Sequence, residues 1–184
     1  MESPAAVCRG FTLIEASISL CVTALLVGLA VPAWSNAVSA AHAAQAQAEL
    51  FQTLTTALTH ATATGAEVVV CPSRDGRGCT GGSDWSGGWV AFADLDGDRQ
   101  RDARDTLLRQ HGPLTGGVHL RTSAGRPRIV FQPHGGAAAG YNATFTLCDR
   151  RGPGKATALV LANSGRLRQD RPGEDAVRAC LWGG

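Results

Sequence analysis

A stretch of 21 residues near the N-terminus, from Phe11 to Val31, contains a single charged side chain, Glu15, and limits what the chain can become. At a rise of about 1.5 Å per residue, a helix over this stretch would be roughly 31 Å long, which matches the hydrocarbon core of a bilayer. A polar decapeptide ending in Cys8-Arg9-Gly10 precedes it, whereas an ordinary secretory signal has its apolar region before the cleavage site. The sequence therefore predicts one transmembrane helix over residues 11–31.

Glu15 is unusual in such a segment. A carboxylate in hydrocarbon is costly and commonly marks a functional site. If the chain were cut after Gly10, the new amine of Phe11 would lie one helical turn from Glu15. An amine of the same or a neighbouring subunit would then neutralise the carboxylate. Two alternatives remain open: an uncleaved membrane anchor, and ordinary signal cleavage near Ala40.

The run Gly10-Phe11-Thr12-Leu13-Ile14-Glu15, followed by an apolar stretch, resembles the signature of type IV prepilins. In that family a prepilin peptidase cleaves after the glycine and methylates the new N-terminal phenylalanine, and the glutamate guides the docking of subunits in the filament. The resemblance implies a leader over residues 1–10, cleavage and N-methylation at Gly10 and Phe11, and an assembly role for Glu15. One departure is that the leader contains Glu2 and a single Arg, so it is less basic than usual.

A second helical pattern follows Pro32, which is expected to bend the helix or to mark its exit from the membrane. Residues 33–64 contain no Gly or Pro, and apolar residues recur there at helical spacing. Gly65 then offers a C-cap. One helix is therefore predicted over residues 11–64, with its second half packed on a sheet. The apolar stripe consists of Leu50, Leu54, Ala57, Leu58 and Ala61.

The remainder of the chain, residues 65–184, has the pattern of a β-rich globular domain. Short, partly β-branched segments alternate there with clusters of Gly, Pro, Asn and Asp. The predicted fold class is α+β: a long N-terminal helix, transmembrane in its first half, packed against an antiparallel β domain. The expected strands are Glu67–Cys71, Gly88–Ala93, Thr106–Gln110, Val118–Thr122, Arg128–Gln132, Thr144–Cys148, Ala156–Ala162 and Arg166–Gln169.

The first half of this domain carries a second resemblance. Val70-Cys71-Pro72-Ser73 is followed by Cys79, by Asp84-Trp85, by Gly88-Trp89-Val90-Ala91-Phe92 and by an Asp-rich turn. This series resembles the FimT/GspH-type minor pilins and pseudopilins. The Cys-Pro-Ser and Asp-Trp…Gly-Trp elements look closer to FimT of type IV pili than to GspH of type II secretion.

Four cysteines in the domain allow three disulfide pairings. Disulfides persist outside the cytoplasm, where the membrane segment would place the domain. Proximity in the sequence favours Cys71–Cys79 and Cys148–Cys180. The second bridge would stabilise the fold by roughly 3–4 kcal/mol in the chain-entropy model. The alternative is a metal site, but no His or Cys lies at ligand spacing around these four residues, so no metal is predicted.

Positive charge is concentrated in the last third of the chain. Residues 1–116 hold 7 basic and 11 acidic side chains, whereas residues 117–184 hold 10 and 4. The run Gly165-Arg166-Leu167-Arg168 lies in the basic part, and an extended backbone there would put both arginines on one face. There are two alternatives: a solvated strand face, or arginines that pair with the acids Asp170, Glu174 and Asp175.

This Gly-Arg-x-Arg run resembles the one in FimT proteins that bind DNA during natural transformation. The resemblance implies that Arg166 and Arg168 are the principal contacts and that Gly165 allows a close approach to DNA. Lys155 and Arg171 are added from charge alone. Binding would be independent of sequence, because guanidinium groups contact phosphate oxygens. No stacking platform is predicted, since Trp182 is the only aromatic residue after Phe145.

Two further patterns lead to no predicted site. Five Asp residues fall at positions of a calcium-loop pattern, but Arg99 occupies the place of the essential glycine, which favours a solvated, self-paired turn. The five histidines are scattered, and no Ser or Cys has a nucleophile setting, so neither an enzyme nor a cofactor is predicted. The Asp residues are Asp94, Asp96, Asp98, Asp102 and Asp105.

Together these features predict a minor pilin of a type IV pilus that binds extracellular double-stranded DNA for natural transformation. Its expected partners are major and minor pilins, the prepilin peptidase, the inner membrane and DNA. It would span the inner membrane once before assembly and then occupy the periplasm and the cell-surface pilus. The main alternative is a type II secretion pseudopilin that contacts protein partners. A membrane-anchored periplasmic enzyme is a third hypothesis, but the sequence shows no catalytic constellation.

Overall fold

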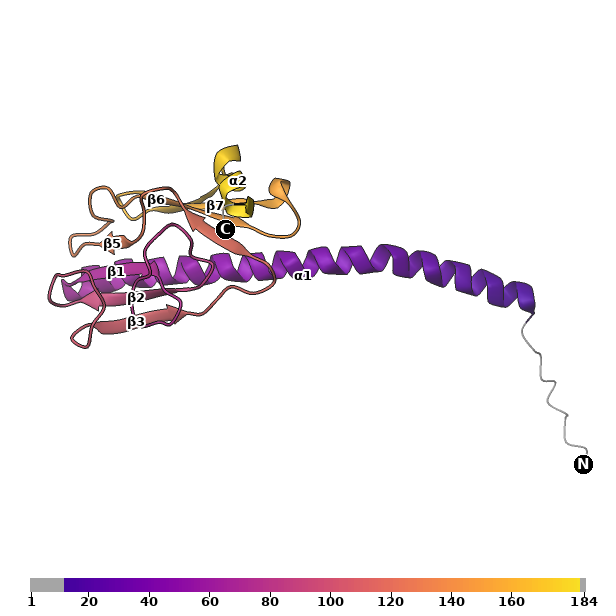
Figure 1. Cartoon of the computed structure of the whole chain (residues 1–184), viewed down its shortest axis with the longest axis horizontal. Coiled ribbons are helices and arrows are strands. Elements are labelled where there is room, and N and C mark those ends of the chain that lie inside the picture. The colour runs from indigo at the N-terminus through magenta and orange to yellow at the C-terminus, as the bar shows by residue number, and fades with distance from the viewer. Residues whose placement is uncertain (1–11, 183–184) are drawn as a thin grey trace, which may run out of the picture. The chain divides into compact units, whose positions relative to one another are not determined.

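The predicted N-terminal helix is present in the computed structural model, which describes residues 12–182 of the chain (Figure 1). This helix, α1, extends over Leu13–Thr64 and continues through Pro32. At its start the Thr12 hydroxyl accepts a hydrogen bond from the Glu15 backbone N–H at 3.3 Å, which is a capping contact. At its end Gly65 has a φ of 74° and its N–H donates to the Ala61 carbonyl at 3.1 Å. The predicted C-cap is therefore confirmed.

The chain divides into two compact units, one up to Ala37 and the other from Val38 onward. In the first unit, every described side chain from Thr12 to Ala37 is exposed. α1 is long and apolar enough to cross a bilayer by length and composition. A membrane-spanning length and composition was the expectation for residues 11–31. Phe11 lies outside the described residues.

The second unit contains the rest of α1 and two four-stranded antiparallel sheets. The first sheet has the order β3-β2-β1-β5 and the second has the order β4-β6-β7-β8. A short helix, α2, and one 3-10 turn, η1, complete the described part of this unit. The strands of the first sheet are β1 (Glu67–Pro72), β2 (Trp89–Asp94), β3 (Thr106–His111) and β5 (Ile129–Phe131). The other elements are β4 (His119–Thr122), β6 (Ala143–Cys148), η1 (Pro153–Lys155), β7 (Thr157–Leu161), β8 (Leu167–Asp170) and α2 (Glu174–Trp182).

One hydrophobic core joins both sheets to the second half of α1. The predicted apolar stripe faces this core, where Leu50 and Leu54 are fully buried. Trp89 is also fully buried, and its indole N–H donates to the Thr53 hydroxyl at 3.1 Å, which ties β2 to α1. Trp85 meets Phe145 of β6 edge to face at 5.1 Å between ring centroids. These contacts explain why the two tryptophans are packing residues rather than a ligand platform.

Each predicted strand is present, and its ends differ from the prediction by no more than one residue. The two disulfides are Cys71–Cys79 and Cys148–Cys180, the pairings that sequence proximity favours. α2 was not predicted from the sequence. Only two of its nine side chains, Val177 and Cys180, are buried. The apolar pattern that indicates a helix is therefore short, and the segment was interpreted from its charged residues instead.

Candidate functional site

A tight hairpin turn positions the arginines of the tail. The Gly165 N–H donates to the Ala162 carbonyl at 2.9 Å, and the Ala162 N–H donates to the Arg166 carbonyl at 3.0 Å. Gly165 has a φ of 81°, and a Cβ there would lie 2.9 Å from Leu58 Cδ2. Glycine is therefore needed for the turn and for packing on α1. Because Gly165 is buried, its expected approach to DNA has no support in this geometry.

Arg166 and Arg168 are both exposed and alternate with Leu167, which packs against the core. Alternation along an extended backbone puts the two arginines on the outer face of the second sheet. Arg168 forms an ion pair with Asp170, two residues further along the same face. Arg166 has no acidic partner among residues 12–182. The alternative of an arginine paired with a neighbouring acid thus describes Arg168 and leaves Arg166 available for a ligand.

Lys155 and Arg171 lie at the opposite end of the same hairpin. The register pairs Ala158 with Asp170, so Arg171 leaves β8 where β7 begins, and Lys155 ends η1 just before β7. Both side chains are exposed, and neither has an acidic partner in the described part of the chain. Of the four predicted cations, named here the cations of β8, Arg168 lies within β8 and Arg166 and Arg171 flank the strand at its two ends. Lys155 precedes β7 on the side of Arg171.

Asp149 and Arg151 form an ion pair at the base of this region, in which the Asp149 carboxylate is buried and Arg151 is partly exposed. This pair was not predicted from the sequence. The Arg151 guanidinium donates from Nε to Asp149 Oδ1 at 2.9 Å and from Nη2 to Asp149 Oδ2 at 2.7 Å. The Arg151 backbone N–H also donates to Asp149 Oδ1, at 2.8 Å. Burial raises the pKa of the Asp149 carboxyl, but these hydrogen bonds outweigh it and hold the pKa below its usual 3.8. The pair fixes the turn between Cys148 and η1.

Replacing Asp149 by Asn is expected to lower the free energy of unfolding by about 2 kcal/mol at neutral pH, because Arg151 then keeps a charge without a partner. A lowered folded pKa contributes stability above the unfolded pKa, and this contribution is lost as pH falls through the folded value. The loss relative to wild type should therefore shrink below about pH 3.8, the unperturbed value. Denaturant unfolding across pH measures this.

The matched control for this pair is Asp175→Asn. Asp175 pairs with Arg178 at 3.0 Å, but its side chain is 99% exposed, whereas that of Asp149 is 2% exposed. Solvent screens the exposed pair, so its loss should change stability little. Equal losses for the two variants would contradict the proposed role of the buried pair.

The Asp-rich loop is self-paired, as the sequence analysis favoured. Asp94 accepts hydrogen bonds from the N–H groups of Gly97 at 2.9 Å and Arg99 at 3.0 Å. Arg104 bridges Asp96 at 2.6 Å and Asp102 at 2.9 Å. Burial raises the pKa of Asp94. Most carboxylates of the loop therefore already accept hydrogen bonds from backbone N–H groups or pair with an arginine.

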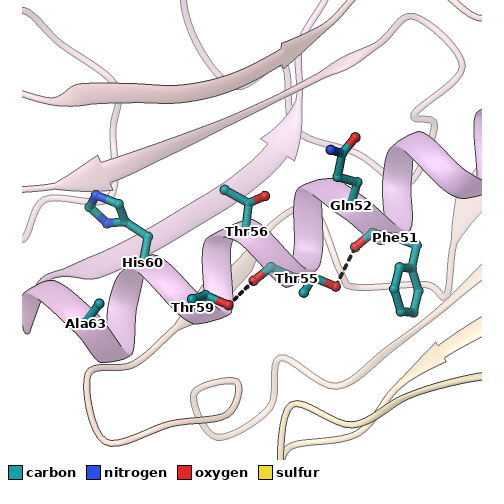
Figure 2. A pocket seen from close by; sticks show the side chains of 7 residues that line it. All are labelled: Phe51, Gln52, Thr55, Thr56, Thr59, His60 and Ala63. Carbon is teal, nitrogen blue, oxygen red and sulfur yellow. Dashed lines mark hydrogen bonds between the residues drawn. The ribbon is translucent and has the colours of Figure 1, made fainter.

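The second half of α1 leaves one face uncovered, with a shallow groove of about 550 Å³ (Figure 2). The Thr55 hydroxyl donates to the Phe51 carbonyl at 2.8 Å, and the Thr59 hydroxyl donates to the Thr55 carbonyl at 2.9 Å. These hydroxyls are turned back to the helix, so the threonines present methyl groups beside the half-exposed Phe51 ring. The face is therefore more apolar than its composition suggests. Its lining residues are Phe51, Gln52, Thr55, Thr56, Thr59, His60 and Ala63.

Comparisons with known proteins agree with this architecture. The model of a family described as type II transport protein GspH matches residues 46–165, more than half of the chain. Two crystal structures of the type IV minor pilin FimU of Pseudomonas aeruginosa are similar. One has 15% identity and a TM-score of 0.50 over 77% of this chain and 92% of FimU; the other has 16% identity and a TM-score of 0.48 over 73% and 91%.

A search of curated proteins gave no match. At 15% identity the likeness to FimU shows the fold: a long N-terminal helix followed by antiparallel sheets. The family itself rests on the family model, which covers the second half of α1 and most of both sheets. This chain therefore belongs to the GspH family of type IV pilin-like proteins.

Proposed function

We propose that this protein is a minor pilin that is assembled into a type IV pilus and binds extracellular double-stranded DNA for natural transformation. The observation that carries the proposal is the set of exposed cations in and around β8, of which Arg166, Lys155 and Arg171 have no acidic partner among the described residues. Free guanidinium and ammonium groups on one edge of a sheet suit a phosphate backbone. Proteins of the pilin family are structural subunits, and we propose no catalytic role for this one.

Maturation follows from the N-terminal signature. We propose that the prepilin peptidase removes residues 1–10 and methylates Phe11, so that the chain passes from the inner membrane to the periplasm and the cell-surface pilus. Gly10 and Phe11 lie outside the described residues. Glu15 lies on the exposed first part of α1, where it is the only charged side chain between Thr12 and Ala37. Its position supports a pairing with the amine of Phe11 in the same or a neighbouring subunit.

Assembly with other pilins is implied by the family. We propose that major and minor pilins cover the uncovered face of α1 beside Phe51. An exposed groove lined by methyl groups and an aromatic ring on a soluble domain favours a protein contact. Arg166 and Arg168 lie on the outer face of the second sheet, whereas Leu167 between them packs on the core that contains α1. DNA and a neighbouring pilin can therefore bind the same subunit.

The arrangement of the cations predicts binding that does not depend on base sequence. Arginine side chains on a flat strand face reach phosphate oxygens, which are the same for every base pair. Affinity should fall steeply with salt, because each phosphate contact releases condensed counterions.

Replacing Arg166 and Arg168 together by Ala is expected to weaken binding of duplex DNA. The slope of log affinity against log salt should fall by roughly 1.8, about 0.9 for each lost phosphate contact. Arg166→Ala alone should account for more than half of the loss, because Arg168 already pairs with Asp170. Electrophoretic mobility shifts of the mature chain in detergent, over a range of salt, measure both quantities.

The matched control for the tail is Arg74→Ala with Arg77→Ala. These two arginines are also exposed, but they lie in the Cys71–Cys79 loop, away from β8. The control changes net charge by the same amount and should leave the salt slope close to wild type. If the tail double variant binds DNA as well as wild type at low salt, the tail is not the DNA site.

The second candidate function is that of a type II secretion pseudopilin. The description of the matching family, a type II transport protein, favours it. In that case the cations of β8 would contact protein partners. A deletion strain separates the two functions: loss of DNA uptake with intact secretion supports the pilus assignment, and loss of secretion with intact uptake supports the pseudopilin.

A further inference from the structure

Trp182, the last residue of α2, has an exposed ring. Its side chain is 71% exposed, whereas Trp85 and Trp89 in the same unit are fully buried. A large aromatic side chain left in water is most informative when it borders a cavity beside charged groups. Trp182 borders such a cavity, which the sequence alone does not show, because one wall comes from Pro153 and Gly154, about thirty residues earlier in the chain.

These neighbours form a groove of about 560 Å³ between α2 and η1. Pro153 and Gly154 contribute one wall from η1, and Pro172 comes from the segment that joins β8 to α2. Val177 and the Trp182 ring contribute apolar surface from α2. The remaining lining residues are Glu174 and Arg178. The groove thus presents a flat ring and proline surfaces, together with one acidic and one basic side chain.

The groove is held rigidly on the second sheet. Cys180, two residues before Trp182, is bonded to Cys148 at the end of β6. α2 contacts β6 and β4, and Figure 1 shows α2 beside β6. The buried Asp149–Arg151 pair fixes the next turn of the chain, which leads into η1. A site whose walls are fixed before binding loses less conformational entropy when a ligand enters.

Unpaired positive charge flanks the groove at two points, because Lys155 follows the lining residue Gly154 and Arg171 precedes the lining residue Pro172. Residues 149–179 carry 7 basic and 4 acidic side chains. Three of the acids are already paired: Asp149 with Arg151, Asp170 with Arg168, and Asp175 with Arg178. Within the described residues this leaves one unpaired acid, Glu174, against four unpaired cations. These cations are Arg150, Lys155, Arg166 and Arg171.

We propose that the Trp182 groove stacks an unpaired nucleobase, so that the cations of β8 and this groove together bind single-stranded DNA. The inference rests on the proposed DNA-binding function and names a further ligand class for the same surface. A positively charged path with an aromatic ring is the usual arrangement for single strands, and stacking tolerates any base. A blunt duplex offers no free base face, so it would use the cations alone.

The test compares a single-stranded oligonucleotide with the blunt duplex of the same sequence, each carrying a fluorophore, by anisotropy with the mature chain in detergent. Trp182→Ala is expected to weaken single-strand binding by roughly 5- to 160-fold, which corresponds to the loss of one stacked base. Duplex affinity should stay within about twofold. Trp182→Phe keeps a ring and should retain most of the single-strand affinity.

The variants separate this inference from the proposed function. If Trp182→Ala binds single strands like wild type, or loses both ligands equally, the stacking site is wrong. The DNA-binding function is then tested separately by Arg166→Ala with Arg168→Ala, which should weaken the binding of both single strands and duplex. If Trp182→Ala changes only pilus assembly, the groove receives a neighbouring pilin and the inference is overturned. Wild type that binds neither ligand would overturn both. Thermal melting confirms that each variant is folded.

Discussion

Replacing Glu15 by Gln is expected to abolish incorporation of this protein into a filament, while the chain still inserts into the membrane. The carboxylate lies among exposed apolar residues. In the proposed membrane or filament these residues would be surrounded by lipid or by other helices, where a charge needs a partner. Breaking a buried ion pair costs roughly 3–5 kcal/mol, which corresponds to more than a hundredfold in an equilibrium constant. Gln removes the negative charge and so removes the attraction to the amine of Phe11, which lies outside the described residues.

The measurement is the amount of this subunit in sheared filaments relative to the membrane fraction. Ser19→Ala is a suitable control, because the Ser19 hydroxyl donates to the Glu15 carbonyl at 2.8 Å and lies one turn further along the same helix. That variant should assemble normally. Mass spectrometry of the membrane form should show a methylated Phe11 in wild type. Normal assembly of Glu15→Gln, or a mature chain that begins elsewhere, would contradict the proposed pairing.

The predictable part of the fold is the part encoded locally. Alternating β-branched segments ended by Gly and Pro indicated each strand to within one residue, and the apolar stripe of residues 50–61 indicated the buried face of α1. The cysteine pairing was also accessible, because proximity in the sequence limits the loop that each bridge closes. These signals need no knowledge of which segments become neighbours in space.

The candidate site could be predicted only in part, because its properties depend on neighbours from other elements. The exposed arginines were found from a short motif. Asp170, the partner of Arg168, is only two residues away in the sequence, so this pair was among the alternatives that the sequence offered. The burial of Gly165 could not be predicted, because Gly165 packs against Leu58 on α1, more than 100 residues earlier. The Trp182 groove needs the Cys148–Cys180 bridge to bring α2 beside η1. Sequence alone shows an isolated tryptophan near the end of the chain.

Removing the Cys148–Cys180 bridge, by Cys148→Ser with Cys180→Ser, is expected to lower the free energy of unfolding by roughly 3–4 kcal/mol in the chain-entropy model. The two cysteines are 32 residues apart, and Val177 and Cys180 are the only buried side chains of α2. Without the bridge, a nine-residue helix has too little buried area and too few turns to stay docked. Denaturant unfolding followed by fluorescence of the buried tryptophans measures the loss.

The other bridge is a matched control within the same chain. Cys71 and Cys79 are 8 residues apart, so removing this bridge should cost less, roughly 2.5 kcal/mol. It should also leave single-strand DNA binding intact, because the Cys71–Cys79 loop is not part of the groove between α2 and η1. Loss of the Cys148–Cys180 bridge should weaken single-strand binding as much as Trp182→Ala does. If that variant still binds single strands like wild type, α2 stays docked without its disulfide, and packing of Val177 alone must hold the groove together.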